Sequence, residues 1–177
     1  MHWRTSKKSL RVAASGATAT AALAAFGATG HAAPALSPRN TSLAAVNPAA
    51  CPWKGASGPR KFDGHGYYKG SCASFAAWAI RTDGRHHRRS PDFLGVAGDW
   101  TGAATSAVPH VGDIAQWDPG VHGFGSEGHV AYVVAVDHDG TVTLHEYGYR
   151  SAYNDFRPGS LSIRSTSASD PSRYLRF

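Results

Sequence analysis

The chain has 177 residues, a length typical of one domain, and a formal net charge of +6 from 18 Lys and Arg against 12 Asp and Glu. Four of the basic residues and none of the acidic ones lie in residues 1–32, which leaves 14 basic and 12 acidic residues in the remainder. A remainder so close to neutral gives little reason to infer nucleic-acid binding, and we expect no nucleic-acid partner.

Residues 1–32 have the three parts of a secretory signal peptide. Basic residues between Arg4 and Arg11 precede an uncharged, Ala-rich stretch from Val12 to Gly30, and small residues around Ala32 offer a cleavage site. We therefore predict a secreted protein, extracellular or associated with a cell wall, without stable membrane insertion after processing. The alternative is an uncleaved anchor, which the Gly, Ser and Thr within the apolar stretch disfavour.

Residues 33–50 are rich in Ala, Pro, Asn and Ser and have little periodicity, so we interpret them as a linker before a domain over residues 51–177. After a Gly-rich irregular segment, the sequence predicts a helix from Cys72 to about Thr82. Ser71 is a suitable N-cap for this helix, and Asp83-Gly84 is a typical stop.

The segment after the helix begins with a basic cluster, Arg85 to Arg89, in a predicted loop. This cluster is either a solvated loop or a contact for an anionic polymer. We expect a second short helix over residues 98–107. Strands are predicted over residues 113–117, 129–136, 141–147, 160–165 and 172–177, the strongest being His129 to Val136. A helix followed by an antiparallel meander predicts an α+β fold.

Cys72 is a candidate nucleophile because a thiol at a helix start lies near the positive end of the helix dipole and near free N–H groups. Both features favour the thiolate. Two alternatives remain at this point. Cys72 could pack as a small apolar residue, or it could form a disulfide with Cys51, which is plausible chemistry in an exported chain and would consume the nucleophile.

The strand pattern also offers a base and an acid. A four-residue turn from Asp137 to Gly140 would pair Val136 with Thr141 and make Glu146 the diagonal neighbour of His129 on one sheet face. Glu146 could then orient the imidazole, which takes the thiol proton. A three-residue turn would place the two residues on opposite faces, and a surface His–Glu pair without catalytic function is the simpler alternative.

The segments GYYKGSCASFAAWAI, PHVGDIAQW, GHVAYVVAV and TVTLHEY resemble the CHAP family of cysteine, histidine-dependent amidohydrolases/peptidases, in the NlpC/P60 superfamily. The resemblance spans about Cys51 to Phe177. It implies a papain-like fold, with the nucleophile helix packed on an antiparallel sheet. It also implies Cys72 as nucleophile, His129 as base and Glu146 as orienting acid.

The resemblance further implies that the chain cleaves amide bonds in the peptide part of bacterial peptidoglycan, as an endopeptidase or an N-acetylmuramoyl-L-alanine amidase. Peptidoglycan is then the expected partner of a monomeric enzyme that uses no metal or cofactor. Two positions depart from the family pattern, since Gly148 and Val96 stand where the family often has Asn.

Two other functions compete with this one. The first is a non-catalytic wall-binding module of the same fold, with a Cys51–Cys72 disulfide. The second is a zinc hydrolase, prompted by the histidine content but lacking an H-E-x-x-H or C-x-x-C motif.

Overall fold

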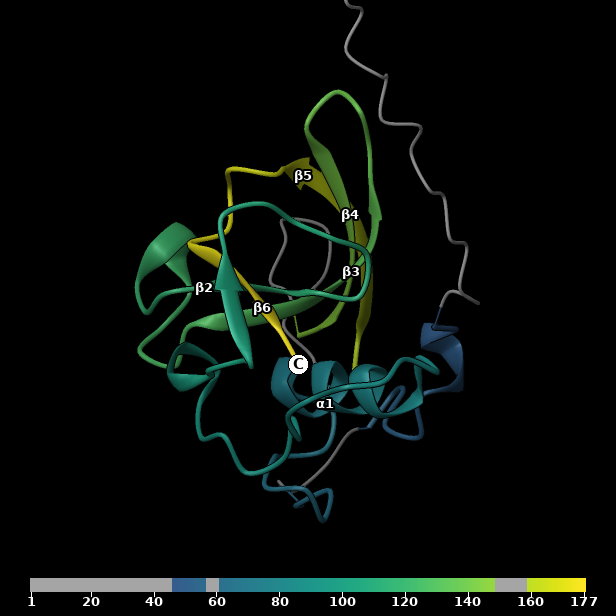
Figure 1. Cartoon of the computed structure of the whole chain (residues 1–177). Helices are drawn as coiled ribbons and strands as arrows, with labels where there is room; N and C mark the ends of the chain where they lie inside the picture. The colour runs from purple at the N-terminus through teal and green to yellow at the C-terminus, as the bar shows by residue number, and fades with distance from the viewer. Residues whose placement is uncertain (1–45, 57–60, 149–158) are drawn as a thin grey trace, which may run out of the picture. The chain divides into compact units, whose positions relative to one another are not determined.

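The computed structural model describes residues 46–56, 61–148 and 159–177 (Figure 1). The predicted signal peptide lies outside these residues, and so does the predicted linker up to residue 45. Of the predicted linker, Val46 is only 6% exposed and belongs to the core, and Pro48–Ala50 forms a short 3₁₀ helix, η1. Packing of the folded part therefore begins before Cys51.

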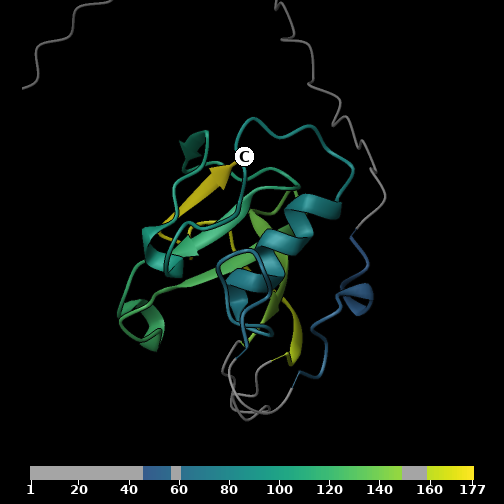
Figure 2. The same cartoon turned by 90° about the horizontal axis from the view of Figure 1, so that it is seen from below.

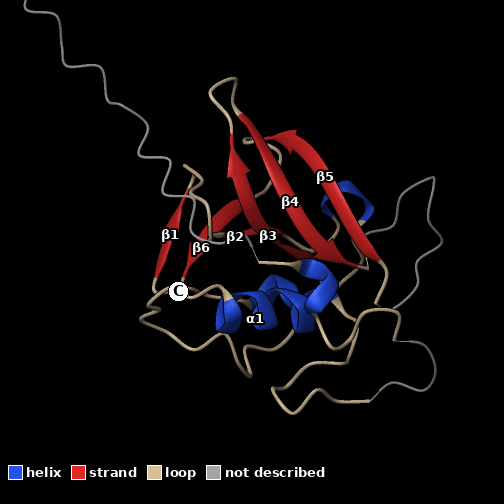
Figure 3. Cartoon of the chain, turned by 90° about the vertical axis from the view of Figure 1, so that its right-hand side faces the viewer, coloured by secondary structure: helices blue, strands red, loops and turns tan. Residues whose placement is uncertain are grey.

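The described residues form an α+β structure, as predicted, with one α-helix against a six-stranded antiparallel sheet (Figures 2 and 3). The sheet order is β1-β6-β2-β3-β4-β5. The elements are α1 (Cys72–Thr82), η2 (Ala97–Asp99), β1 (Ala104–Ser106), β2 (Ile114–Trp117), η3 (Val121–Gly123), β3 (His129–Val136), β4 (Thr141–Tyr147), β5 (Leu161–Ser167) and β6 (Arg173–Arg176). No helix among the described residues is long and apolar enough to cross a bilayer.

Helix α1 begins where two serines satisfy backbone N–H groups that the helix itself leaves unpaired. The Ser71 hydroxyl accepts from the Ser74 N–H at 3.1 Å, and the Ser74 hydroxyl accepts from the Gly70 N–H at 3.1 Å. The helix ends at Thr82 with Asp83 as its C-cap, and Gly84 follows with a positive φ of 73°. Both ends match the sequence prediction.

The sheet carries apolar side chains on both faces, so both faces are covered by other parts of the chain. On the helix side, Phe75 and Ile80 of α1 pack with Val130, Tyr132 and other sheet residues. The opposite face forms a second cluster, which is made of Ala115, Trp117, Ala131, Val133, Val142, Leu144 and Tyr174 and is covered by Val121, Phe124 and Ala168. Burial on both faces fixes which side of each strand a residue can occupy.

The β3–β4 hairpin combines the two registers considered from the sequence. Tyr132 pairs with His145 and Val133 with Leu144, as the preferred register requires, but Val136 pairs with Val142 and not with Thr141. The predicted pairing at the turn is therefore wrong. The Asp137 N–H donates to the Thr141 carbonyl at 2.8 Å, which closes a tighter turn, and a bulge between Val133 and Ala135 absorbs the extra residue.

The predicted second helix over residues 98–107 is also wrong, since only η2 and the short strand β1 form there. The side chain of Gln116 explains the difference. Its Nε2 donates to the carbonyls of Ala97 (2.8 Å), Gly98 (3.2 Å) and Trp100 (3.1 Å), which an α-helix would have used internally. Tertiary hydrogen bonds thus override a weak helical propensity.

We expect Phe75→Ala to lower the free energy of unfolding by about 3–5 kcal/mol, because it removes a fully buried ring and leaves a cavity. Phe75 has 0% exposure and stacks on Tyr147 at a centroid distance of 4.4 Å. Urea denaturation measures the change. The matched control is Phe62→Ala at a 63% exposed ring, which should cost about 1 kcal/mol or less. Equal losses for both variants would contradict the assigned core.

Candidate active site

Cys72 is the first residue of α1, and its thiol interacts with His129 and Val130 at the start of β3. The sulfur is hydrogen-bonded by the imidazole of His129 and by the backbone N–H groups of Val130 and Ala73. Its side chain is partly buried, so it retains some access to solvent. The structure therefore brings together the two residues that the sequence singled out as nucleophile and base.

These contacts shift the proton equilibria of both groups toward an ion pair. Burial alone raises the pKa of the Cys72 thiol, but the charge of His129 and the three hydrogen bonds outweigh it, and the pKa is lowered overall. Burial likewise disfavours imidazolium. The Cys72 and Glu146 charges and hydrogen bonds overcome this effect and raise the pKa of His129 to about 9. The geometry thus favours thiolate beside imidazolium at neutral pH.

Glu146 lies on the other side of the same imidazole. His129 Nε2 and Glu146 Oε2 are 2.6 Å apart, and the two residues are 3% and 0% exposed. Since Nε2 faces the carboxylate, Nδ1 remains for the thiol. Gly128 helps to fix this placement, because a Cβ at its φ of 68° would lie 2.6 Å from the Trp117 carbonyl oxygen.

Arg164 completes the site, and the sequence did not single it out. Its Nε donates to Glu146 Oε1 at 2.6 Å, so the carboxylate is held between an imidazole and a guanidinium. Arg164 lies opposite Leu144 in the β4–β5 register, which makes it a diagonal neighbour of Glu146. The feature of the sequence that could have identified Arg164 is its charge, because the other residues of β5 are Ser, Thr, Leu and Ile.

An aromatic layer covers the imidazole. The Phe124 ring stacks on His129 with centroids 4.3 Å apart and an interplanar angle of 6°, and Trp117 lies 5.6 Å from the same ring. The Trp117 indole N–H donates to Asp170 at 3.2 Å, and the Arg164 guanidinium lies 5.0 Å above the Trp117 ring. The sequence did not predict this role for Phe124. The residue lies in a predicted turn, and its position depends on the local fold of η3.

Both cysteines are free thiols in this structure, so no Cys51–Cys72 disulfide is formed. Cys51 is buried beside Tyr147, and burial raises the pKa of its thiol. Across the described ranges, no group of three or more His, Cys, Asp or Glu residues is arranged to hold a metal ion.

The two positions that depart from the family pattern both lie in the described part of the chain. Gly148 directly follows β4 with a positive φ of 68°, and its N–H donates to the Ser160 carbonyl at 3.2 Å. Val96 occupies the N-cap of η2 and provides no side-chain cap. The first departure is therefore tied to backbone conformation, since positive φ favours Gly and tolerates Asn better than a branched residue.

Comparisons with known proteins support this description. A family model described as the CHAP domain matches residues 62–148. Among solved structures, the chain is similar to an N-acetylmuramoyl-L-alanine amidase from Staphylococcus aureus, with a TM-score of 0.50 and 24% sequence identity. That match covers 62% of this chain and only 31% of the staphylococcal chain, and at this identity it shows the fold alone. No curated protein sequence gives a significant match.

The opposite pKa shifts of the two thiols predict selective alkylation. We expect iodoacetamide to label Cys72 at least about tenfold faster than Cys51 at mildly acidic pH, where an ordinary thiol is almost fully protonated. The sign follows from a lowered pKa at Cys72 and a raised one at Cys51. Mass spectrometry of the labelled peptides measures both rates.

The control for this labelling is His129→Gln, which removes the positive charge beside the thiol and should move the onset of Cys72 labelling to higher pH. Slow labelling of both cysteines at equal rates in the unmodified chain would disprove the ion pair.

Proposed function

Because residues 62–148 of this chain match the CHAP domain family, we propose that it is a secreted cysteine hydrolase that cleaves amide bonds in the peptide part of bacterial peptidoglycan. The observation that carries the proposal is the contact of the Cys72 thiol with His129, whose other nitrogen is held by Glu146. A thiol, a base and an orienting acid in this order are the parts that nucleophilic amide hydrolysis requires. We also assign the fold to the papain-like, NlpC/P60-type class.

In the proposed reaction, the Cys72 thiolate attacks the amide carbonyl and a C–S bond forms. The His129 imidazolium gives its proton to the leaving nitrogen as the C–N bond breaks, which leaves a thioester. Water then attacks the thioester while the imidazole accepts its proton. The C–S bond breaks, and the carboxylic acid product leaves the thiolate–imidazolium pair restored.

The start of α1 supplies a donor for the negative oxygen that develops on the carbonyl. The first N–H groups of a helix have no partner within the helix. Ser71 satisfies the N–H of Ser74, and the Ala73 N–H contacts the thiol. No acceptor in the described part of the chain takes the Cys72 N–H, and we assign this group to the oxyanion.

Glu146 and Arg164 act in this mechanism as positioning residues. The carboxylate fixes which imidazole nitrogen faces the thiol and stabilises the imidazolium. Arg164 in turn fixes the carboxylate through Oε1. In the family pattern an Asn often follows two positions after the acid, and Gly148 cannot provide such a side chain. Arg164 therefore supplies a support for Glu146 that this chain lacks at residue 148.

The nature of the scissile bond separates two activities with the same chemistry, an endopeptidase and an N-acetylmuramoyl-L-alanine amidase. The staphylococcal neighbour is an amidase by name, but its likeness to this chain extends to the fold only. Mass spectrometry of the fragments released from purified peptidoglycan identifies the bond. New amino termini within stem or cross-bridge peptides indicate an endopeptidase, and free lactyl carboxylates on muramic acid indicate an amidase.

The central test is the loss of hydrolysis on removal of each triad member. We expect Cys72→Ala and His129→Ala each to reduce peptidoglycan hydrolysis by about 10³-fold or more, measured by release of soluble fragments. Glu146→Gln should lose less than either, because Glu146 transfers no proton to substrate.

Circular dichroism and thermal melting of each variant provide the control for folding. If folded Cys72→Ala retained hydrolysis, the cysteine mechanism would be wrong. The binding-module alternative would gain support if the purified wild-type chain bound peptidoglycan without cleaving it.

The support of Glu146 by Arg164 leads to a further prediction. We expect Arg164→Gln to lower kcat by about tenfold and to leave KM within about twofold, because the residue supports Glu146 and does not contact substrate. Arg164→Lys keeps the charge without the planar fork and should restore part of the activity. The pH profile of kcat/KM should shift in the Gln variant and return toward wild type in the Lys variant.

The matched control is Arg81→Lys, at an arginine whose salt bridge with Asp92 lies at the far end of α1. This variant should leave kcat and the pH profile unchanged. A purely structural role for Arg164 would appear as reduced thermal stability with normal kinetics in the folded fraction, and would contradict the assignment.

A further inference from the structure

A basic groove lies at the C-terminal end of α1, away from Cys72. It is formed by two adjoining cavities of about 300 Å³ and about 270 Å³, which share Arg85 and His87. Arg88 and Arg89 line the first cavity, and Arg176 lines the second. We refer to the surface formed by these five residues as the basic groove.

The negative charges near this groove are already engaged. Asp92 pairs with Arg81, and Asp113 pairs with Arg176 at 3.1 Å. Asp83 is only 6% exposed and accepts hydrogen bonds from the Tyr132 hydroxyl, the Arg85 N–H and His87.

In contrast, Arg88 and Arg89 are exposed, and no carboxylate in the described part of the chain pairs with either. The groove therefore has a surplus of positive charge that the protein itself does not neutralise.

The loop that carries these arginines is anchored at several points. His87 Nε2 lies 2.9 Å from Asp83, and the Arg85 N–H donates to the same carboxylate at 2.8 Å. Further along, the Tyr67 hydroxyl donates to the Pro91 carbonyl at 2.5 Å. A held backbone reduces the entropy that a ligand must remove on binding. The groove is thus preorganised, unlike a freely solvated basic segment.

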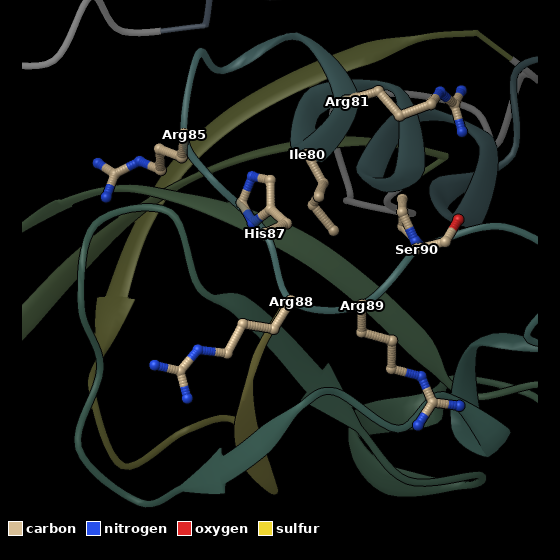
Figure 4. Close-up of a pocket in the computed structure, with 8 residues that line it drawn as sticks. Ile80, Arg81, Arg85, His87, Arg88, Arg89 and Ser90 are labelled. Atoms are coloured by element: carbon tan, nitrogen blue, oxygen red, sulfur yellow. The ribbon is translucent and has the colours of Figure 1, made fainter.

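The arrangement of the guanidinium groups indicates the shape of the ligand. Figure 4 shows that Arg88 and Arg89 extend from the same side of the loop and spread apart, while Arg85 points in another direction. The three groups do not converge on one point, as they would around a small anion. Their diverging directions suit a chain that presents repeated negative charges.

We propose that the basic groove binds a linear phosphodiester polymer, the choice of a wall polymer following from the proposed function. Guanidinium groups bind the oxygens of phosphates and carboxylates in a planar, two-pronged geometry. A phosphodiester chain presents such oxygens at regular intervals along its backbone, as the diverging arginines require. A membrane surface fits less well. The apolar residues of the first cavity, Ile80 and Pro91, are buried, and of the apolar side chains that line the second cavity only Val111 is exposed, at 36%. One such side chain offers too little apolar surface for insertion into lipid.

The groove lies at the opposite end of α1 from the catalytic thiol, so polymer binding and amide hydrolysis would take place at different sites. Cys72 is the first residue of α1, whereas Arg81 and the groove adjoin its last turn. A helix of 11 residues is about 16 Å long. A polymer in the groove would therefore hold the protein on its insoluble substrate without covering the thiol.

The test compares binding of the full chain to poly(glycerol phosphate), a phosphodiester polymer, in wild type and in the double variant Arg88→Gln/Arg89→Gln. We expect about tenfold weaker binding in the variant and a weaker dependence on salt. The charge-matched control, Lys54→Gln/Lys61→Gln, removes two exposed lysines elsewhere and should change affinity by less than about twofold. Absence of binding by wild type, or an equal loss in the control, overturns the proposal.

Two further probes test the chemistry of the ligand. Poly-γ-glutamate of matched charge should bind more weakly than poly(glycerol phosphate), and equal binding overturns the assignment to phosphate. Vesicles of phosphatidylglycerol and phosphatidylcholine in equal parts should bind weakly, and tighter binding to vesicles than to the polymer assigns the groove to membranes instead.

A third comparison separates this proposal from the proposed function, since polymer binding requires no catalysis and is measured equally well with Cys72→Ala. On a short soluble peptide substrate, Arg88→Gln/Arg89→Gln should retain wild-type kcat/KM. A loss there would place the two arginines in the substrate site and overturn the separate polymer site.

Discussion

The buried carboxylate of Glu146 is the constraint on which the site depends. A charge with no exposure is costly unless both oxygens are satisfied, and here each oxygen has one cationic partner at 2.6 Å. The partners come from β3 and β5, on either side of β4. All three strands must therefore be in correct register before the charge is neutralised. With the thiolate of Cys72, the charges alternate in sign along the whole series and balance to zero, which is how such a cluster can be buried.

The same requirement explains the irregular β3–β4 hairpin. The tight turn closed by Asp137 and Thr141 would by itself shift the pairing and move Glu146 to the wrong face. The bulge between Val133 and Ala135 removes that shift before the strands reach the site. The turn therefore requires one strand register and the site requires another. The extra residue at the bulge allows both registers in the same hairpin. Bulges next to functional sites commonly have this effect of re-aiming side chains.

The sequence predicted the parts of the site that depend on local pattern. The Ser71 cap, the helix of Cys72 and the alternation of β4 follow from nearby residues, and they bring Cys72, His129 and Glu146 together as expected. Arg164 could not be placed, because a long connection precedes β5 and leaves the β4–β5 register unspecified. The second predicted helix failed because side-chain bonds from Gln116, which is distant in sequence, replaced local ones.

The catalytic site and the basic groove lie near opposite ends of helix α1, but the helix dipole accounts for charge only at the site. Its N-terminal end favours the Cys72 thiolate, and its C-terminal end favours cations such as Arg81 in the last turn. The influence of the dipole falls off within one turn of the helix end. Arg88 and Arg89 lie several residues beyond Thr82, so helix stabilisation does not account for them. Nor does neutralisation by carboxylates, since the nearby Asp83, Asp92 and Asp113 are engaged by other groups. Two adjacent cations without an internal electrostatic role, on an anchored loop beside a cavity, are thus available to the anionic ligand that we propose.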